Sequence, residues 1–179
     1  METLFAEKTA APAQKVGHRN RPIRRVAVLG AGIMGSRIAC HFANIGVDVT
    51  LLDMVPKELN DAEKAKKLML DSKPVRNRIV NDLFQAALKA SPAALYNASF
   101  ANRITLGNFD DNMKDIATAD WVIEVVVERL DIKKIIYEQV EKYRKPGTLI
   151  TSNTSGIPIH LMAEGRSDEN LVGDKLKLS

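Results

Sequence analysis

Three spaced glycines after an apolar run limit the folds open to this chain more than any other feature. The run Ile23–Leu29 is nearly continuous and rich in β-branched side chains, which is typical of a strand buried on both faces of a parallel sheet. It ends in Gly-Ala-Gly-Ile-Met-Gly at 30–35, and a helical pattern follows over 33–44. Gly46 is the expected end of that helix, and 47–52 reads as a second strand. Together these pieces predict one βαβ unit.

The glycine turn predicts a dinucleotide site. The G-x-G-x-x-G spacing lies between a strand and a helix, and the acid Asp53 follows 18 residues after the last glycine. Gly30 is expected to permit the tight turn, Gly32 the close approach of a pyrophosphate, and Gly35 the packing of helix on strand. The free N–H groups at the start of the helix attract the negative charge. The alternative is a glycine turn that binds no ligand.

The cofactor predicted by this pattern is NAD. Asp53 is expected at the carboxyl end of the second strand, where its carboxylate can accept hydrogen bonds from both hydroxyls of an adenosine ribose. The same carboxylate would repel the 2′-phosphate of NADP. No arginine stands in the following Met54–Pro56 to bind that phosphate.

The remainder of the chain alternates between helical and strand patterns. The predicted elements are helices at 58–70 and 74–90, a strand at 103–109, a short helix at 110–119, a strand at 120–127, a helix at 130–144 and a strand at 148–153. This order favours the α/β class, as a Rossmann doubly wound parallel sheet with a helical insertion after the second strand. We expect a flexible basic arm at 1–21, the Rossmann domain at 22–168 and an unassigned tail at 169–179.

Charge and cysteine content narrow the partners and the compartment. Six of the 26 bases and two of the 22 acids lie in 1–25, which leaves 20 of each in the rest of the chain. The body of the domain is therefore not predicted to bind nucleic acid. No apolar run approaches the roughly 20 residues of a membrane span. The lone Cys40 excludes an internal disulfide and favours the cytoplasm. We predict no metal site.

Polar side chains follow two of the later strands. Glu128 and Lys133 come after 120–127, and the run Ser-Asn-Thr-Ser at 152–155 follows the last strand. Rossmann domains bind their ligands at the carboxyl ends of strands, so both groups are candidates for a site. The alternative for the second group is a loop that only caps a helix.

Three separated motifs resemble the NAD-binding domain of the L-3-hydroxyacyl-CoA dehydrogenases, a β-oxidation family that also occurs fused to enoyl-CoA hydratases. The matching stretches are VAVLGAGIMGSRIA, DWVIEVVVERLDIKK and TSNTSGIPI. The resemblance covers about residues 23–167, and a plain Rossmann domain would share only the first motif. The helical insertion also fits, since in this family it helps to hold the CoA thioester.

The resemblance implies hydride transfer between the 3-hydroxyl of an acyl-CoA and NAD. It implies that Ser155 touches both the nicotinamide and the substrate oxygen, and that Asn153 is a positioning amide beside it. The implied cofactor contacts are Gly30, Gly32, Ile33, Met34, Gly35, Asp53, Val126, Val127, Glu128, Lys133 and Ser155.

One part of the family pattern is absent from this sequence. The resemblance implies a general-base histidine in a His-Phe-Phe-Asn-Pro segment well after Ser155, but the chain reads GRSDENLVGDKLKLS there. His18, His41 and His160 lie elsewhere, and none matches that position. The carboxylate that orients the histidine and the helical C-terminal domain, which usually forms the dimer interface, are missing too. We therefore expect the chain alone to bind NAD but to turn over little substrate.

Two other functions stay open at this level. One is an NAD-binding module that transfers no hydride. The other is a Rossmann dehydrogenase of the 3-hydroxyisobutyrate or 6-phosphogluconate type, which would lack the SNTSG run and would place a catalytic lysine in a later domain. Glu128, Lys133 and Ser155 favour the 3-hydroxyacyl-CoA type, because a module needs no polar group where a substrate hydroxyl would lie.

Overall fold

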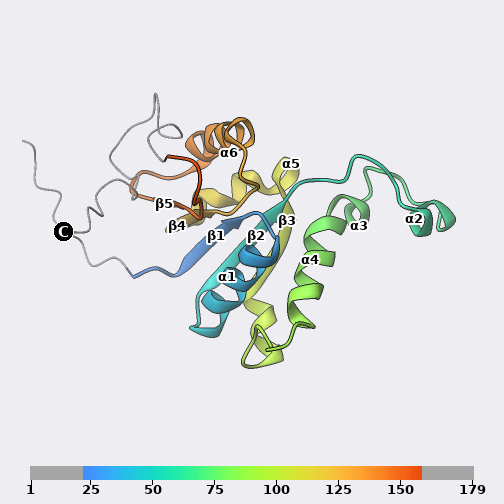
Figure 1. Ribbon diagram of the computed structural model, residues 1–179, viewed down its shortest axis with the longest axis horizontal. Helices are drawn as coiled ribbons and strands as arrows, with labels where there is room; N and C mark the ends of the chain where they lie inside the picture. The colour runs from blue at the N-terminus through green and yellow to red at the C-terminus, as the bar shows by residue number, and fades with distance from the viewer. Residues whose placement is uncertain (1–21, 159–179) are drawn as a thin grey trace, which may run out of the picture.

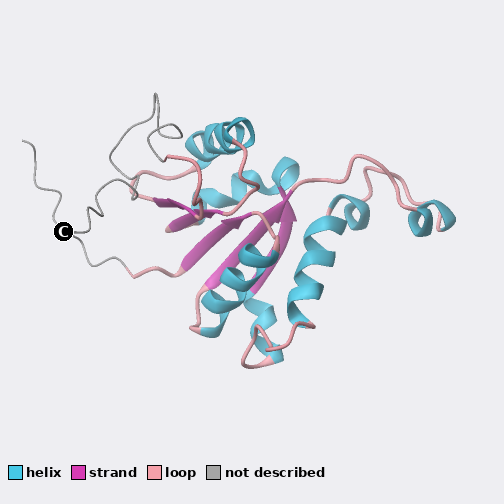
Figure 2. Ribbon diagram, in the orientation of Figure 1, coloured by secondary structure: helices cyan, strands magenta, loops and turns pink. Residues whose placement is uncertain are grey.

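A five-stranded parallel sheet with helices on both faces forms the centre of the protein (Figures 1 and 2). The computed structural model describes residues 22–158, so the predicted arm at 1–21 and tail at 169–179 lie outside the described residues. The strands are β1 (Arg25–Leu29), β2 (Asp48–Asp53), β3 (Ile104–Asn108), β4 (Trp121–Glu124) and β5 (Leu149–Ser152). The helices are α1 (Ile33–Asn44), α2 (Asp61–Ala65), α3 (Lys73–Arg76), α4 (Arg78–Leu88), α5 (Phe109–Asn112) and α6 (Leu130–Tyr143), with 3₁₀ turns η1 (Ala98–Arg103) and η2 (Met113–Thr118).

The strand order β3-β2-β1-β4-β5 confirms the predicted Rossmann fold. The chain runs outward from β1 through β2 to β3, and then returns to the other side of β1 as β4 and β5. The direction of winding therefore reverses between β1 and β4. Ligands of open α/β sheets bind at the carboxyl ends of the strands at such a reversal, and the glycine turn begins there.

The central strand β1 contributes to two separate cores. Val26 and Val28 pack with side chains of α1 and α4 on one face, whereas Ala27 and Leu29 pack with those of η2 and α6 on the other. Successive side chains of a strand point to opposite faces, so one apolar run serves both layers. None of the helices in 22–158 is long and apolar enough to cross a membrane.

The insertion between β2 and β3 is less helical than the sequence predicts. The helix expected at 58–70 is reduced to α2, and Lys67 just beyond it has a left-handed backbone (φ 54°) that cannot continue a helix. The helix expected at 74–90 is broken at Asn77 into α3 and α4. The 3₁₀ turn η1 was not predicted. In Figure 1 the α2 segment lies well away from the sheet.

Two further elements are shorter or less regular than predicted. The strand expected at 120–127 ends at Glu124, because the amide of Val126 donates to the side chain of Glu124 (2.7 Å) instead of continuing the ladder. The helix expected at 110–119 is divided into α5 and η2. The early end of β4 matters for the site, since the predicted cofactor contacts Val126 and Val127 then lie in a loop and not in a strand.

A buried pair of asparagines joins the insertion to the sheet. The side-chain amide of Asn108 donates to Asn77 Oδ1 (2.7 Å) and to Asp111 Oδ2 (2.9 Å), and its Oδ1 accepts from the amide of Asp111 (2.9 Å). Asn108 thus caps α5 while its side chain is buried.

We predict that Asn108→Ala lowers the free energy of unfolding by about 2 kcal/mol, because it removes a cap and leaves a buried acceptor on Asn77 without its donor. Asn97→Ala is the matched control, because Asn97 caps η1 at an exposed position and should cost less than about 1 kcal/mol. Urea denaturation of both variants tests this. Equal losses would contradict the buried role of Asn108.

Candidate functional site

The glycine turn after β1 is built from two crowded glycines and one open one. A Cβ on Gly30 (φ 110°) would lie 2.7 Å from the carbonyl oxygen of Val125, and one on Gly35 would lie 1.7 Å from that of Gly30. A Cβ on Gly32 would meet nothing within 4 Å. Packing inside the domain therefore requires the first and third glycines. The second faces open space, which fits a site where a ligand approaches the backbone.

The start of α1 offers donors to an anion. Gly32 is the N-cap residue, and no side chain caps the helix or places an acid in its first turn. The first N–H groups of a helix lack partners within it and lie at the positive end of its dipole. A cradle without a Cβ and uncapped N–H groups together fit the pyrophosphate of a dinucleotide.

Asp53 supports this turn from the neighbouring strand. Its Oδ2 accepts a hydrogen bond from the amide of Ala31 (2.6 Å), and its Oδ1 accepts from that of Met54 (2.7 Å). A carboxylate has about four acceptor positions, so two stay available to ribose hydroxyls. Asp53 is therefore placed at the carboxyl end of β2 as predicted, and it also holds the glycine turn, a role that the sequence pattern did not indicate.

Apolar side chains are exposed around the same edge. Ile33 and Met34 open α1, Met54 follows β2, and Val127 follows β4; all four are exposed, Ile33 most of all at 80%. Three of them are predicted cofactor contacts. Large apolar side chains gathered at a strand edge are typical of a surface that is covered by a ligand or partner.

Lys133 lies in a different setting from the one that its predicted role requires. Its side chain is fully buried, and its ammonium bonds both carboxylate oxygens of Glu124 (2.8 and 3.0 Å). It also lies 3.5 Å from Glu128 Oε2. The side chain is thus occupied by protein groups, and a direct cofactor contact of Lys133 stays a prediction.

Sequence reasoning missed Glu124. This carboxylate is also fully buried, and it accepts from the amide of Val126 (2.7 Å) and the hydroxyl of Ser152 (2.5 Å) as well as from Lys133. Its position inside an apolar strand was the available signal, because a charged residue is rarely fully buried unless it is paired.

Glu128 binds the loop that carries the predicted catalytic serine. Its Oε1 accepts from the hydroxyl of Thr154 and from the amides of Ser155 (3.2 Å) and Gly156 (2.8 Å). The bond from Thr154, followed by that from Gly156, lowers the pKa of Glu128 from an ordinary value of 4.5 to about 2, and the Lys133 ammonium adds to the effect. Glu128 is therefore a carboxylate that holds the loop in place.

The structure brings the two predicted substrate-side residues to the end of β5. The backbone amide of Asn153 donates to the backbone carbonyl oxygen of Glu124 (2.8 Å). The side chains of both Asn153 and Ser155 are exposed. Of the three histidines, the structure describes only His41, on α1. His18 and His160 lie outside the described residues.

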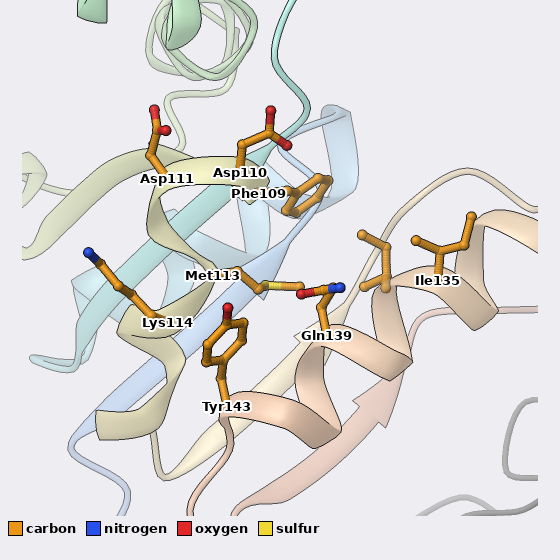
Figure 3. Close-up of a pocket in the computed structure, with 9 residues that line it drawn as sticks. Phe109, Asp110, Asp111, Met113, Lys114, Ile135, Gln139 and Tyr143 are labelled. Atoms are coloured by element: carbon orange, nitrogen blue, oxygen red, sulfur yellow. The ribbon is translucent and has the colours of Figure 1, made fainter.

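A cavity of about 410 Å³ lies between α5, η2 and α6 (Figure 3). Met113, Gln139 and Tyr143 are among its lining residues, and none of the predicted site residues lines it. In the part of the chain between 22 and 158, no group of three or more His, Cys, Asp or Glu side chains is placed to hold a metal ion.

Comparison with known proteins assigns the family. Residues 25–173 match the family described as 3-hydroxyacyl-CoA dehydrogenase, NAD binding domain. The chain belongs to this family. It is 49% identical over 150 residues to a probable 3-hydroxyacyl-CoA dehydrogenase of Bacillus subtilis. The matched region covers 84% of this chain and 19% of that protein. A protein of the same description from Deinococcus radiodurans is 42% identical, over 82% of this chain and 38% of its own length.

A solved structure shows the same fold. The (S)-3-hydroxybutyryl-CoA dehydrogenase of Ralstonia eutropha matches with a TM-score of 0.54 and 29% identity, over 82% of this chain and 46% of that one. The chain thus spans less than half the length of these relatives. The family membership and the NAD-binding domain that the resemblance implied are confirmed, whereas the roles of single site residues stay predictions.

The three glycines should separate stability from binding. We predict that Gly32→Ala leaves the melting temperature unchanged but weakens NADH binding at least tenfold, because its methyl group enters only the space outside the backbone. Gly35→Ala should cost about 3 kcal/mol or more, because its methyl group overlaps a backbone oxygen. Thermal melting and NADH titration of both variants test this. Loss of stability in Gly32→Ala would contradict the open position of that glycine.

The lowered pKa of Glu128 predicts how the stability of the fold changes in acid. Folding depresses this pKa, so the contribution to stability is full above about pH 4.5 and is lost as the pH falls towards 2. The stability difference between the wild type and Glu128→Gln should therefore be constant near neutrality and shrink below pH 4.5. Denaturant unfolding between pH 7 and 2.5 measures it. Glu138→Gln, on α6, is the control, and a matching profile in it would contradict the loop contact.

Proposed function

We propose that this chain is the cofactor-binding part of an NAD-dependent dehydrogenase that acts on the 3-hydroxyl group of an acyl-CoA in fatty acid β-oxidation. The observation that carries the proposal is the pairing of an open glycine turn with a loop of small polar residues, 152–156, held by Glu128 on the other side of the strand reversal. A domain that only stored NAD would not need this loop. The described relatives of the chain support the substrate class.

Two separate groups of residues bind the two halves of the cofactor. Gly32 and the start of α1 hold the pyrophosphate, and Asp53 accepts the hydroxyls of the adenosine ribose. The backbone of Val126 and Val127, just after β4, borders the nicotinamide half. When bound, NAD supplies the hydride acceptor.

Ser155 and Asn153 orient the substrate. Both side chains are exposed at the carboxyl end of β5, and the Glu128 carboxylate fixes the backbone amide of Ser155. The Ser155 hydroxyl donates a hydrogen bond to the oxygen at C3, and the Asn153 amide holds that oxygen from beside it. This arrangement keeps C3 facing the nicotinamide.

The proton of the 3-hydroxyl needs a base from outside the described residues. Among the described residues, His41 is an exposed side chain in the last turn of α1, and its ring lies edge-on to that of Phe42. A positioned general base contributes roughly 10²–10⁴ in rate, so hydride transfer without one should be slow. In a longer protein a helical domain supplies the base and the oligomer contacts.

The insertion supports the CoA part of the proposal, and the lone cysteine supports the predicted compartment. The segment from α2 to α3 extends away from the sheet (Figure 1) and carries lysines, which suits the negatively charged CoA.

Cys40 is buried in the core, and burial raises the pKa of its thiol, so the cysteine is inert. A protein with one inert thiol and no disulfide suits the reducing cytoplasm.

Titration with NADH and NADPH tests the cofactor assignment. Asp53→Ala should weaken NADH binding by roughly 10- to 100-fold, the worth of hydrogen bonds to a charged group, and should reduce the preference over NADPH. Asp48→Ala, at the exposed start of the same strand, is the matched control and should bind as the wild type does. Fluorescence or calorimetry measures both. Wild-type protein that binds NADPH as tightly as NADH would contradict the assignment.

A further inference from the structure

Three successive residues at the junction of α3 and α4 hold the insertion through three different contacts. They are Arg76, Asn77 and Arg78. Successive side chains of a helix point about 100° apart, so three neighbours can reach three separate parts of the molecule. Their partners are, in that order, Asp111 of α5, Asn108 of β3 and Glu63 of α2.

The contact of Arg78 reaches farthest into the insertion. Its Nη1 donates to Oε2 of Glu63, and its Nη2 donates to the backbone carbonyl oxygen of Glu58 (3.1 Å). The side chains of Arg78 and Glu63 are only 19% and 10% exposed, so water screens this ion pair far less than the exposed pair of Lys64 and Asp61. One guanidinium therefore fastens both α2 and the loop before it to α4.

Glu63 also caps its own helix. The same Oε2 accepts from the backbone amide of Asn60 (2.9 Å), while Oδ1 of Asn60 accepts from the backbone amide of Glu63 (2.8 Å). Glutamine can complete such a capping box as well as glutamate, but it cannot form an ion pair with Arg78. One substitution can therefore separate the two roles of Glu63.

The other two contacts of the junction fix it to the carboxyl edge of the sheet. Asn108 is the last residue of β3, and it pairs with Asp53 at the end of β2. Asp111 lies in the first turn of α5, directly after the end of β3. The insertion leaves this edge after Asp53 and is brought back to it at Asn77. The junction therefore sets where α2 lies relative to the edge.

The segment 57–73 between these anchors has side chains that suit CoA, which carries phosphate groups and a less polar pantetheine arm. Met69 and Leu70 are 68% and 44% exposed. The same segment carries five exposed lysines: Lys57, Lys64, Lys66, Lys67 and Lys73. Of these lysines, only Lys64 forms an ion pair with a residue that the structure describes.

We propose that Arg78 and Glu63 are positioning residues for the CoA part of the substrate. Their contact keeps the segment 57–73 in one orientation to the carboxyl edge, so that a bound CoA presents its acyl end to the cofactor site. Neither side chain touches CoA. The proposal rests on the proposed function, because it assumes that this segment receives CoA. A segment that is in place only part of the time binds with an affinity reduced by that fraction.

Two charge-matched substitutions on α2 test this role. Glu63→Gln removes the ion pair with Arg78 and keeps the capping box, whereas Asp61→Asn removes an exposed carboxylate that does not contact α4. Each variant loses one negative charge, so the general attraction of α2 for CoA changes equally. Glu63→Gln should weaken CoA binding about fivefold, and Asp61→Asn should not weaken it. NADH affinity should stay unchanged in both. Calorimetry with CoA and with NADH measures these affinities.

Arg78→Lys is a second test, and it keeps the charge of the protein. One ammonium replaces the two guanidinium nitrogens that reach Glu63 and Glu58, so the lysine cannot hold both as the arginine does. CoA binding should weaken by a smaller factor, again without a change for NADH. Circular dichroism checks the fold of each variant. If Glu63→Gln does not fold, the result for Arg78→Lys decides.

The outcomes differ for the two proposals. A loss of CoA affinity in Glu63→Gln that Asp61→Asn does not share supports the positioning role. Equal CoA affinities in these two variants, or a loss of NADH affinity together with CoA affinity in Glu63→Gln, overturn it while leaving the proposed function intact. Wild-type protein that binds NADH but not CoA overturns the positioning role and leaves the NAD assignment. Wild-type protein that binds neither ligand overturns the proposed function as well.

Discussion

The carboxyl edge of the sheet depends on how closely the turn after β1 approaches the backbone after β4. Gly30 has no Cβ, and one placed there would lie 2.7 Å from the carbonyl oxygen of Val125. These two backbones are therefore adjacent, and β5 joins the same edge because it pairs with β4. A side chain at Gly30 would force them apart next to Ala31, whose amide donates to Asp53.

The carboxylates on the two sides of this contact differ in how deeply they are buried. On the β2 side, Asp53 is only partly buried and keeps acceptor positions for a ligand. On the β4 side, Glu124 is fully buried and its acceptors are taken by protein donors. One carboxylate is thus suited to recognition and the other to internal support. Glu128 lies between these extremes, since it is partly exposed but committed to the 154–156 loop.

Local patterns predicted the regular parts of the fold well. The apolar run of β1, the helix α1 and the acid at the end of β2 match their sequence signals, because each depends on periodicity or on one glycine. The insertion was predicted less well. The predicted helix is broken at Asn77, whose side chain is hydrogen-bonded to Asn108, 31 residues away. A contact between residues so far apart cannot be predicted from a short stretch of sequence.

The sequence by itself determined the class of fold, the cofactor and the family, because these follow from short motifs whose spacing backbone geometry dictates. Only the tertiary structure decided which charges are buried and which are exposed at the carboxyl edge of the sheet. In the sequence, Lys133 and Glu128 are both charged residues that follow a strand. In the structure, Lys133 is fully buried, whereas Glu128 is partly exposed and binds the loop after β5. Burial is set by packing between α6, β4 and β5, and that packing joins residues far apart along the chain.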